Sequence, residues 1–517
     1  MEKRIKFLKD EFFWGGPTCN GKSMPISADS DYRIDLRESM QNQCTPLFLS
    51  SKGRYIWSDK PFLVWVEDGC LCFVGEGLEL YEAGECLRDA YLAASRTHFP
   101  FEKKSLPSEF FKRAQYNTWM EFDYNPTEEG VLKYANDIIN AGFEPGIFMI
   151  DEGWQKEYGT WDFNPARFPD PKAMVDELHK LGFIVMLWIT PYVSPDGEEY
   201  VKSIYKEFNP EWYKCQYLRN KNEKVALVEW WNGTSAVLDL RKECDRVFLD
   251  RQLENLMTKY GIDGFKFDGG SYDLYLQSAI VNGEVADDHD AIALNKAWNE
   301  FGTKYEFHEF KDTFNGGGKA TIQRLCDRSH SWDTNGIDTI IPSALMQGLM
   351  GYPYICPDMI GGGSWIYNHF KGQVVDEELF IRMAQVSALF PMMQFSWAPW
   401  RALSKDKFEI VLNAAKLHSS MSAEIGRLVE NAKICGEPMI RPLEYVDPHA
   451  GYAKVSDEFM LGDDILVCPV VTKGTREKDI VFPAGAWQDT SGIVYEGRST
   501  VRLRTDLDKL LWFRRVK

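Results

Sequence analysis

The sequence predicts a mixed α/β fold: a TIM (β/α)8 barrel preceded by a small N-terminal β domain and followed by a C-terminal β-sandwich. Residues 1–112 contain short β-like runs broken by glycine, proline and serine. Between residues 113 and 430, short apolar runs alternate with segments of helical periodicity, which is typical of βα units and a parallel sheet. Short strand-like runs return in residues 431–517. These changes of pattern define three predicted domains.

Eight apolar runs in the middle segment are the candidate barrel strands, and eight strands over about 300 residues match the size of such a barrel. Helical segments fit between several of them. TEEGVLKYANDIINAG opens with Thr127 as an N-cap and closes on Gly142. PKAMVDELHKLG has Pro171 in its first turn and Gly182 at its end. The eight runs are QYNTWMEF, EPGIFMID, FIVMLWIT, DGFKFDGG, KYEFHEF, TIQRLCD, YPYICPD and LFPMMQFS.

Length and charge exclude several classes of protein. A chain of 517 residues is too long for one ordinary hydrophobic core, so two or three domains are expected. The net charge of −18 argues against a nucleic-acid partner, because a phosphate backbone requires a basic surface. The sequence contains no run of about 18 apolar residues, so no membrane span is expected. The first residues also lack the apolar segment of a signal peptide.

Cysteine and histidine usage argues against a metal or a cofactor. The 11 cysteines are odd in number and none stands in a CxxC pair, so reduced thiols in a cytoplasmic enzyme are expected. No histidine cluster suggests a metal site. The glycines at 316–318 lack the Lys-Ser/Thr that follows in a phosphate-binding loop. We therefore expect neither a metal nor a cofactor.

Acidic and aromatic residues end several predicted strands, where a TIM barrel places its chemistry. In DGFKFDGG, Lys266 and Asp268 are two residues apart and point to the same side of the strand. A neighbouring lysine favours an ionised carboxylate, which a covalent nucleophile requires. This strand alone is equally compatible with a structural ion pair. The other polar strand ends are Glu121, Asp123, Asp151, Glu152, Trp188, His308, Arg328 and Asp333.

Four blocks of the chain resemble glycoside hydrolase family 31. They are FEPGIFMIDEGW, FIVMLWITPYVSPD, FKFDGG and SWDTNGIDTIIPSALMQGLMGYPYICPDMIGG, and the resemblance covers roughly residues 115–430 and the sandwich after them. It implies a retaining α-glycosidase. Asp268 falls at the family's nucleophile position, and Asp333 falls at the acid/base position 65 residues later (333 − 268). A loop or N-cap role is the structural alternative for Asp333.

The implied mechanism has two steps. Protonated Asp333 gives its proton to the leaving oxygen while Asp268 attacks the anomeric carbon. Asp333 then activates the water that releases the sugar with its configuration retained. Such a mechanism requires carboxyl groups roughly 5–5.5 Å apart, with opposite tuning of their proton affinities.

The resemblance also implies which residues hold the sugar. Asp151 falls at the family's sugar-binding aspartate, and Glu152 is expected to contribute unless it forms a salt bridge. Trp188 and Trp231 are candidate stacking walls, with barrel packing as the alternative. Arg328 is expected to bind a hydroxyl or to orient the acid/base aspartate. The predicted substrate-binding residues are Asp151, Glu152, Trp154, Trp188, Trp231, Lys266, Arg328 and Trp397.

Three departures from the family pattern put glucosidase specificity in doubt. Gly270 and Ser271 stand where many members carry Glu. Gln394 and Ser396 stand where the eighth strand often supplies Arg and His. The N-terminal domain is also far shorter than in typical α-glucosidases.

Two further resemblances predict galactose as the sugar. VEWWNGTSAVLDL, FKFDGG and MQFSWAPW look most like the branch that contains the animal myogenesis-regulating glycosidase, which implies α-galactosidase activity. IDEGW is similar to an element of families 27 and 36 in which an acidic pair recognises the axial O4 of galactose. The predicted function is exo-acting removal of α-linked galactose from small glycosides or oligosaccharides.

Several alternatives stay open. The enzyme could act on α-glucosides, α-xylosides, sulfoquinovosides or N-acetylated α-sugars. The barrel could instead be a catalytically silent sugar-binding protein, or a metal-dependent hydrolase, although suitably placed histidines are lacking. The expected partner is a small carbohydrate substrate, with no nucleic acid and no membrane, and a homo-oligomer stays open.

Overall fold

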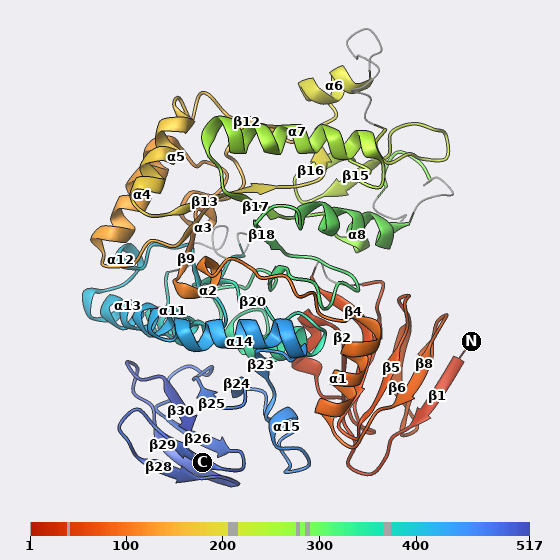
Figure 1. The fold of residues 1–517 in the computed structure, drawn as a ribbon, viewed down its shortest axis with the longest axis vertical. Coiled ribbons are helices and arrows are strands. Elements are labelled where there is room, and N and C mark those ends of the chain that lie inside the picture. Colours follow the sequence, from red (N-terminus) through yellow and green to blue (C-terminus); the bar gives the residue numbers. More distant parts are fainter. Residues whose placement is uncertain are drawn as a thin grey trace. The chain divides into compact units, whose positions relative to one another are not determined.

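The computed structural model describes residues 2–38, 42–204, 216–275, 280–284, 290–364 and 374–516. The chain forms two compact units (Figure 1). The split unit combines Met1–Ala114 with Asn315–Lys517, and the central unit is Gln115–Phe314. Among the described residues, no helix is both long and apolar enough to cross a membrane.

Parallel strands form the main sheet of the central unit, and they coincide with the first five predicted runs. Their order is β9-β10-β13-β17-β18. Because neighbouring strands run in the same direction, residues that follow them gather at one edge of the sheet. The strands are β9 (Gln115–Asn117), β10 (Ile147–Ile150), β13 (Ile184–Ile189), β17 (Gly264–Phe267) and β18 (Phe307–Phe310).

The predicted helices between these strands are present. The side chain of Thr127 caps α4 (Glu128–Asn140), and that of Asp170 caps α5 (Pro171–Lys180), each by accepting a backbone N–H at 3.1 Å. The predicted closing glycines have φ angles of 89° and 93°, which favour glycine. Two further helices follow, α7 (Glu243–Tyr260) and α8 (Ala291–Gly302), shown in green in Figure 1.

Two hairpins extend beyond the carboxyl ends of β10 and β13. The first pairs β11 (Gln155–Glu157) with β12 (Thr160–Phe163) and has Tyr158 in its turn. The second pairs β15 (Leu227–Trp230) with β16 (Gly233–Val237). β16 also pairs with the short β14 (Tyr192–Val193).

The first predicted strand was too long. QYNTWMEF is a strand only as far as Asn117 and continues as the short helix α3 (Trp119–Phe122). The strand ends there because the side-chain oxygen of Asn117 accepts the N–H of Trp119 at 2.7 Å, closing a local turn. Glu121 therefore lies on a helix and not at a strand end.

The other three predicted strands belong to the split unit. β19 (Ile322–Arg324) pairs in parallel with β20 (Ile355–Cys356), and β22 (Gln394–Phe395) pairs in parallel with β21 (Met359–Ile360). All eight predicted runs thus contain a strand. The helices of this part include α9 (Ile340–Leu349), α11 (Glu377–Ala388), α13 (Lys405–Ser420) and α14 (Ser422–Cys435).

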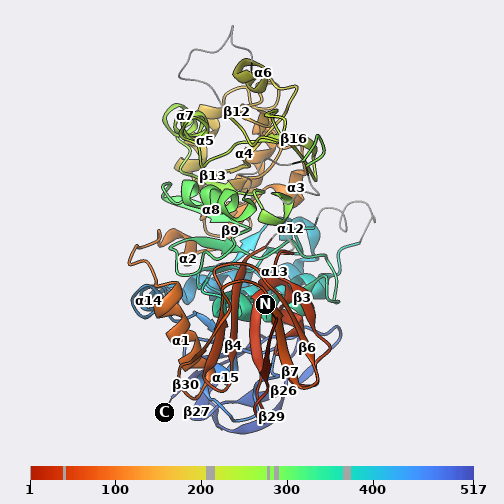
Figure 2. The same ribbon diagram turned by 90° about the vertical axis from the view of Figure 1, so that its right-hand side faces the viewer.

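The N-terminal region folds as two antiparallel sheets, in the orders β1-β7-β6-β3 and β2-β4-β5-β8 (red and orange in Figure 2). Phe48 joins them, since its ring centroid lies 6.0 Å from that of Phe62 and 6.2 Å from that of Phe73. The strands are β1 (Glu2–Lys6), β2 (Phe13–Pro17), β3 (Arg33–Asp35), β4 (Cys44–Ser50), β5 (Arg54–Trp57), β6 (Leu63–Glu67), β7 (Cys70–Val74) and β8 (Glu79–Glu82).

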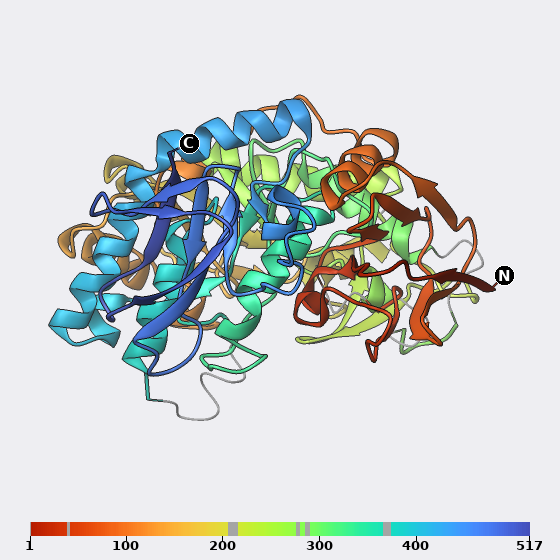
Figure 3. The same cartoon turned by 90° about the horizontal axis from the view of Figure 1, so that it is seen from below.

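The C-terminal region forms a sheet in the order β23-β24-β25-β30-β27-β28 and a separate β26–β29 pair (dark blue in Figure 3). Met460, Trp487 and Phe513 are part of its fully buried core. The strands are β23 (Ile440–Arg441), β24 (Phe459–Leu461), β25 (Ile465–Cys468), β26 (Glu477–Phe482), β27 (Ala486–Gln488), β28 (Val494–Glu496), β29 (Ser499–Arg504) and β30 (Leu511–Arg515).

Candidate active site

Asp268 follows β17 and is only 6% exposed. Its Oδ2 accepts the indole N–H of Trp188 at 2.9 Å and lies 3.7 Å from Nζ of Lys266. Its Oδ1 accepts the backbone N–H of Gly269 at 2.8 Å. Trp188 and Lys266 are register partners on β13 and β17, which explains why both reach the same carboxyl group. A donor or a cation at each oxygen favours the carboxylate anion.

Two glycines turn the chain away from the nucleophile candidate. Gly269 and Gly270 have φ angles of 64° and 68°, a region that favours glycine. A Cβ on Gly270 would lie 2.5 Å from Cδ1 of Trp298. The N–H of Gly270 donates to the hydroxyl of Tyr192 at 3.1 Å. The departure from the family's Glu at this turn therefore has a packing reason, because no side chain fits at Gly270.

Asp151 follows β10 and is buried. Its Oδ2 accepts a hydrogen bond from Nζ of Lys266 at 2.8 Å and from Nδ2 of Asn117 at 2.6 Å, and its Oδ1 accepts the N–H of Glu152 at 2.9 Å. Lys266 thus bridges the carboxylates of Asp151 and Asp268. The sequence analysis missed Asn117, because the overlong first strand placed the strand end at Glu121.

Glu152 is 3% exposed and takes part in no ion pair within the described parts of the chain. Its Oε1 accepts the hydroxyl of Tyr158 at 2.7 Å and also the side-chain amide of Asn232. Burial raises the pKa of Glu152 to about 8, and the charges of Asp151 and Asp268 raise it further. Hydrogen bonds from Tyr158 and Trp231 oppose this shift. Burial therefore favours the neutral, protonated form of Glu152 at neutral pH.

The predicted tryptophans differ in exposure. Trp154 is fully buried and its indole N–H donates to the backbone oxygen of Trp188 at 2.8 Å. Trp188 is also buried and donates its indole N–H to the Asp268 carboxylate. Trp231, in the turn of the β15–β16 hairpin, is 42% exposed. Of these three, only Trp231 is exposed, and Nζ of Lys311 lies 5.9 Å from the centroid of its ring.

The remaining predicted residues belong to the split unit. Asp333 lies on the loop after β19 and is exposed. Its Oδ1 accepts the hydroxyl of Ser331 at 2.7 Å and the N–H of Asn335 at 2.9 Å. The preceding Trp332 donates its indole N–H to Oδ2 of Asp376 at 3.0 Å. These contacts tie the loop on both sides of Asp333.

Arg328 and Trp397 are both buried within the split unit. The guanidinium group of Arg328 donates to Oγ of Ser343 at 3.0 Å, and its backbone N–H donates to Oδ2 of Asp358 at 2.7 Å. The ring of Trp397 lies 5.3 Å from that of His330. Gln394 and Ser396, the residues that depart from the family pattern, are fully buried.

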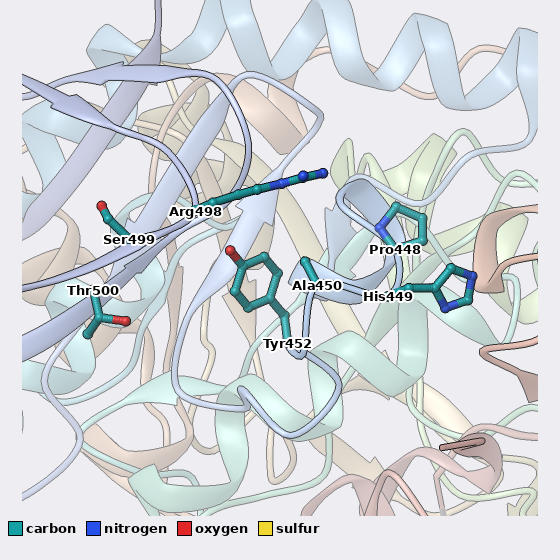
Figure 4. Close-up of a pocket in the computed structure, with 7 residues that line it drawn as sticks. All are labelled: Pro448, His449, Ala450, Tyr452, Arg498, Ser499 and Thr500. Atoms are coloured by element: carbon teal, nitrogen blue, oxygen red, sulfur yellow. The ribbon is translucent and has the colours of Figure 1, made fainter. Parts of the chain in front are cut away.

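A pocket of about 320 Å³ lies within the C-terminal region and contains none of the predicted site residues (Figure 4). Arg498, at its edge, pairs with Asp447 at 3.1 Å. The lining residues are Pro448, His449, Ala450, Tyr452, Arg498, Ser499 and Thr500.

The central unit gathers five predicted residues into one buried cluster of carboxyl groups around a lysine. Such a cluster offers an anionic carboxylate as a nucleophile and further carboxyl oxygens as partners for hydroxyl groups. Across the described ranges, no three His, Cys, Asp or Glu side chains are placed to hold a metal ion. The five residues are Asp151, Glu152, Trp188, Lys266 and Asp268.

A barrel of parallel strands with carboxylates at the strand ends is an arrangement that glycoside hydrolases use. The family model for the TIM-barrel domain of glycosyl hydrolases family 31 matches residues 111–414, and the model for that family's C-terminal domain matches residues 436–516. The chain belongs to glycosyl hydrolases family 31. The predicted family and the predicted TIM barrel with flanking β regions are confirmed.

Relatives within the family differ in their named activities. The myogenesis-regulating glycosidase of Mus musculus is 28% identical over 429 residues, which cover 81% of this chain and 58% of that protein. Alpha-glucosidase 2 of Bacillus thermoamyloliquefaciens is 26% identical over 414 residues, which cover 74% of this chain and 50% of that protein. The chain spans about half the length of the curated relatives it matches.

A solved structure of high similarity is the family 31 dextranase of Flavobacterium johnsoniae in complex with glucose. Its TM-score is 0.83 at 18% identity, and the match covers 99% of this chain and 66% of that chain. This similarity supports the fold.

Proposed function

We propose that the protein is a retaining, exo-acting α-glycoside hydrolase that removes α-linked galactose from small glycosides or oligosaccharides. The observation that carries the proposal is the Asp268 carboxylate. It is buried, receives N–H groups from Trp188 and Gly269, and lies beside the ammonium group of Lys266. Membership of family 31 supports the same chemistry.

The proposed mechanism assigns the two aspartates different roles. Asp268 attacks the anomeric carbon, while protonated Asp333 gives its proton to the glycosidic oxygen and the carbon–oxygen bond breaks. Asp333 then takes a proton from water as the water attacks the anomeric carbon and releases Asp268. Both aspartates return to their starting states, and the sugar leaves with its α configuration.

Galactose is proposed from the acidic pair that follows β10. Asp151 accepts hydrogen bonds from Lys266 and Asn117, and Glu152 beside it is a buried acid whose raised pKa favours the neutral form. A neutral carboxyl group can donate to a hydroxyl group and accept from it, whereas a carboxylate only accepts. We propose that this pair binds the axial O4 of galactose.

A glucoside is the second candidate substrate, because another relative is named an alpha-glucosidase. The two sugars differ in the orientation of O4, so a direct comparison of their nitrophenyl α-glycosides separates them. A catalytically silent barrel is the alternative from a different class.

The test is hydrolysis of a panel of nitrophenyl α-glycosides by the wild type, Asp268→Ala and Asp333→Ala. The control is Asp137→Ala, which removes an aspartate of α4 that pairs with Lys133. We expect galactoside hydrolysis that falls by about 10³-fold or more in both site variants and is unchanged in the control.

Proton NMR of the first product should show the α anomer, as retention requires. Added azide should rescue Asp268→Ala by occupying the place of the nucleophile. Release from the glucoside instead would replace the proposed sugar and keep the mechanism. No release from any glycoside, natural disaccharides included, would favour the silent barrel.

A further inference from the structure

The carboxyl group of Glu152 joins two hairpins that are far apart in the sequence. Tyr158 lies in the turn of the β11–β12 hairpin, and Asn232 lies in the turn of the β15–β16 hairpin. Both donate to the same oxygen, Oε1 of Glu152. The ring of Tyr158 also packs against that of Trp230, with the centroids 5.0 Å apart. One buried acid thus connects two turns that follow different barrel strands.

The residue next to Asn232 is the exposed Trp231. Its ring rests edge-on against Trp230, with a centroid distance of 4.8 Å and an angle of 66° between the planes. Trp230 is buried and packs against Tyr192 at 4.5 Å. Tyr192 in turn accepts the N–H of Gly270, two residues after Asp268. A chain of ring contacts and one hydrogen bond therefore connects the exposed Trp231 with the turn beside the nucleophile candidate.

The buried carboxyl groups and the exposed tryptophan suit different parts of a substrate. The carboxyl groups of Asp151, Glu152 and Asp268 are 2–6% exposed and suit the single ring that is hydrolysed. Trp231 is 42% exposed on a hairpin beyond the strand ends, where the rest of the substrate would lie. The C–H face of a sugar or an aryl ring packs on such an indole face.

We propose that Glu152 is a latch that holds the β11–β12 and β15–β16 hairpins together through Tyr158 and Asn232, and so sets Trp231 as the stacking platform for the leaving group of the substrate. The platform rests on the proposed function, whereas the latch is a property of the fold. Tyr158 and Asn232 are positioning residues, because they act through Glu152 and Trp231.

The latch predicts that a change in one hairpin loosens the other. Tyr158→Phe keeps the ring and removes only the hydroxyl that reaches Glu152. The matched control is Tyr305→Phe, which removes a tyrosine hydroxyl that donates to Asp250 at 2.8 Å elsewhere in the central unit. We expect hydrogen–deuterium exchange in residues 227–237 to become faster in Tyr158→Phe and to stay unchanged in the control.

A complementary variant gives the reciprocal measurement. Asn232→Ala should speed exchange in the β11–β12 hairpin, residues 155–163, although it lies in the other hairpin. Faster exchange confined to the mutated hairpin in both variants would overturn the latch.

The platform is tested with two substrates that differ only in the leaving group. An α-galactosyl fluoride releases fluoride, which cannot stack, whereas an α-galactosyl disaccharide releases a sugar. In Trp231→Ala and in Tyr158→Phe, kcat/KM should fall about five- to tenfold more for the disaccharide than for the fluoride, as expected for loss of one aromatic contact. Equal losses on both substrates would overturn the platform and leave the proposed function intact.

A wild type that hydrolyses neither substrate would overturn the proposed function and not the latch. Hydrogen–deuterium exchange in the two hairpins would still test the latch. Calorimetric titration with the disaccharide would then decide the platform, since Trp231→Ala should weaken binding by a similar factor. Unchanged binding would overturn it.

Discussion

Replacing Glu152 by Gln should stabilise the protein at pH 7 and 8 and have little effect at pH 5. Burial raises the pKa of Glu152 from 4.5 to about 8, so the folded state keeps a proton that the unfolded state releases between these values. The folded state binds more protons in this interval, so the free energy of unfolding falls as the pH rises from about 4.5 to about 8. The loss levels off about one pH unit above the folded-state pKa.

The size of the effect follows from the shift. Full linkage changes stability by about 1.4 kcal/mol per pH unit, so the wild type should lose about 2–3 kcal/mol between pH 5 and pH 7 through this group. Glutamine keeps a side-chain oxygen that can accept from Tyr158 and Asn232, and it has no proton to release. The variant should therefore lack this part of the pH dependence.

Urea unfolding followed by circular dichroism at pH 5, 6, 7 and 8 measures the difference. Glu229→Gln is the matched control, because Glu229 is exposed on β15. The difference in unfolding free energy between Glu152→Gln and the wild type should grow with pH, while that of the control stays flat. A difference for Glu152→Gln that is the same at all four pH values would refute the buried neutral acid.

Three further predictions follow from the same contacts. Trp188→Phe removes a hydrogen bond to the Asp268 carboxylate and should lower kcat/KM about 10- to 100-fold in a galactoside assay, with the melting temperature showing whether folding is preserved. Gly270→Ala should destabilise the protein by about 2 kcal/mol or more in urea unfolding, because the φ angle is 68° and a Cβ would lie 2.5 Å from Trp298. Glu458→Gln should raise stability above pH 7 and not at pH 5, since burial raises the pKa of Glu458 to about 8. Urea unfolding at several pH values measures the gain, and a gain that does not change with pH would contradict the prediction.

A buried arginine that contacts the C-terminal region offers a separate test of stability. Arg382 of α11 is fully buried, and carbonyl oxygens of the C-terminal region surround its guanidinium group at distances between 3.3 and 3.5 Å. Burial lowers the pKa of Arg382 to about 10. Arg382→Met should leave these carbonyl groups unpaired and lower the urea midpoint, whereas Arg427→Met on the half-exposed surface of α14 should not.

The sequence by itself predicted eight runs that each contain a strand, the Thr127 cap of α4, the closing glycines of α4 and α5, and the common side of Lys266 and Asp268. These features depend on local signals: apolar runs, capping residues and closing glycines. The side-chain alternation of a strand places Lys266 and Asp268 on one side, and parallel strands bring their ends to one edge. The four blocks that resemble family 31 include the same strand ends, so the family could also be recognised from the sequence.

The tertiary structure decided what each side chain does there. Trp188 was predicted as a stacking wall, and it donates its indole N–H to Asp268. Glu152 takes its partners, Tyr158 and Asn232, from two hairpin turns, and these residues lie 6 and 80 positions along the chain. Turns that meet above a barrel leave no periodic pattern in a sequence. Their contacts, and the raised pKa of the acid between them, arise only when folding removes that acid from water.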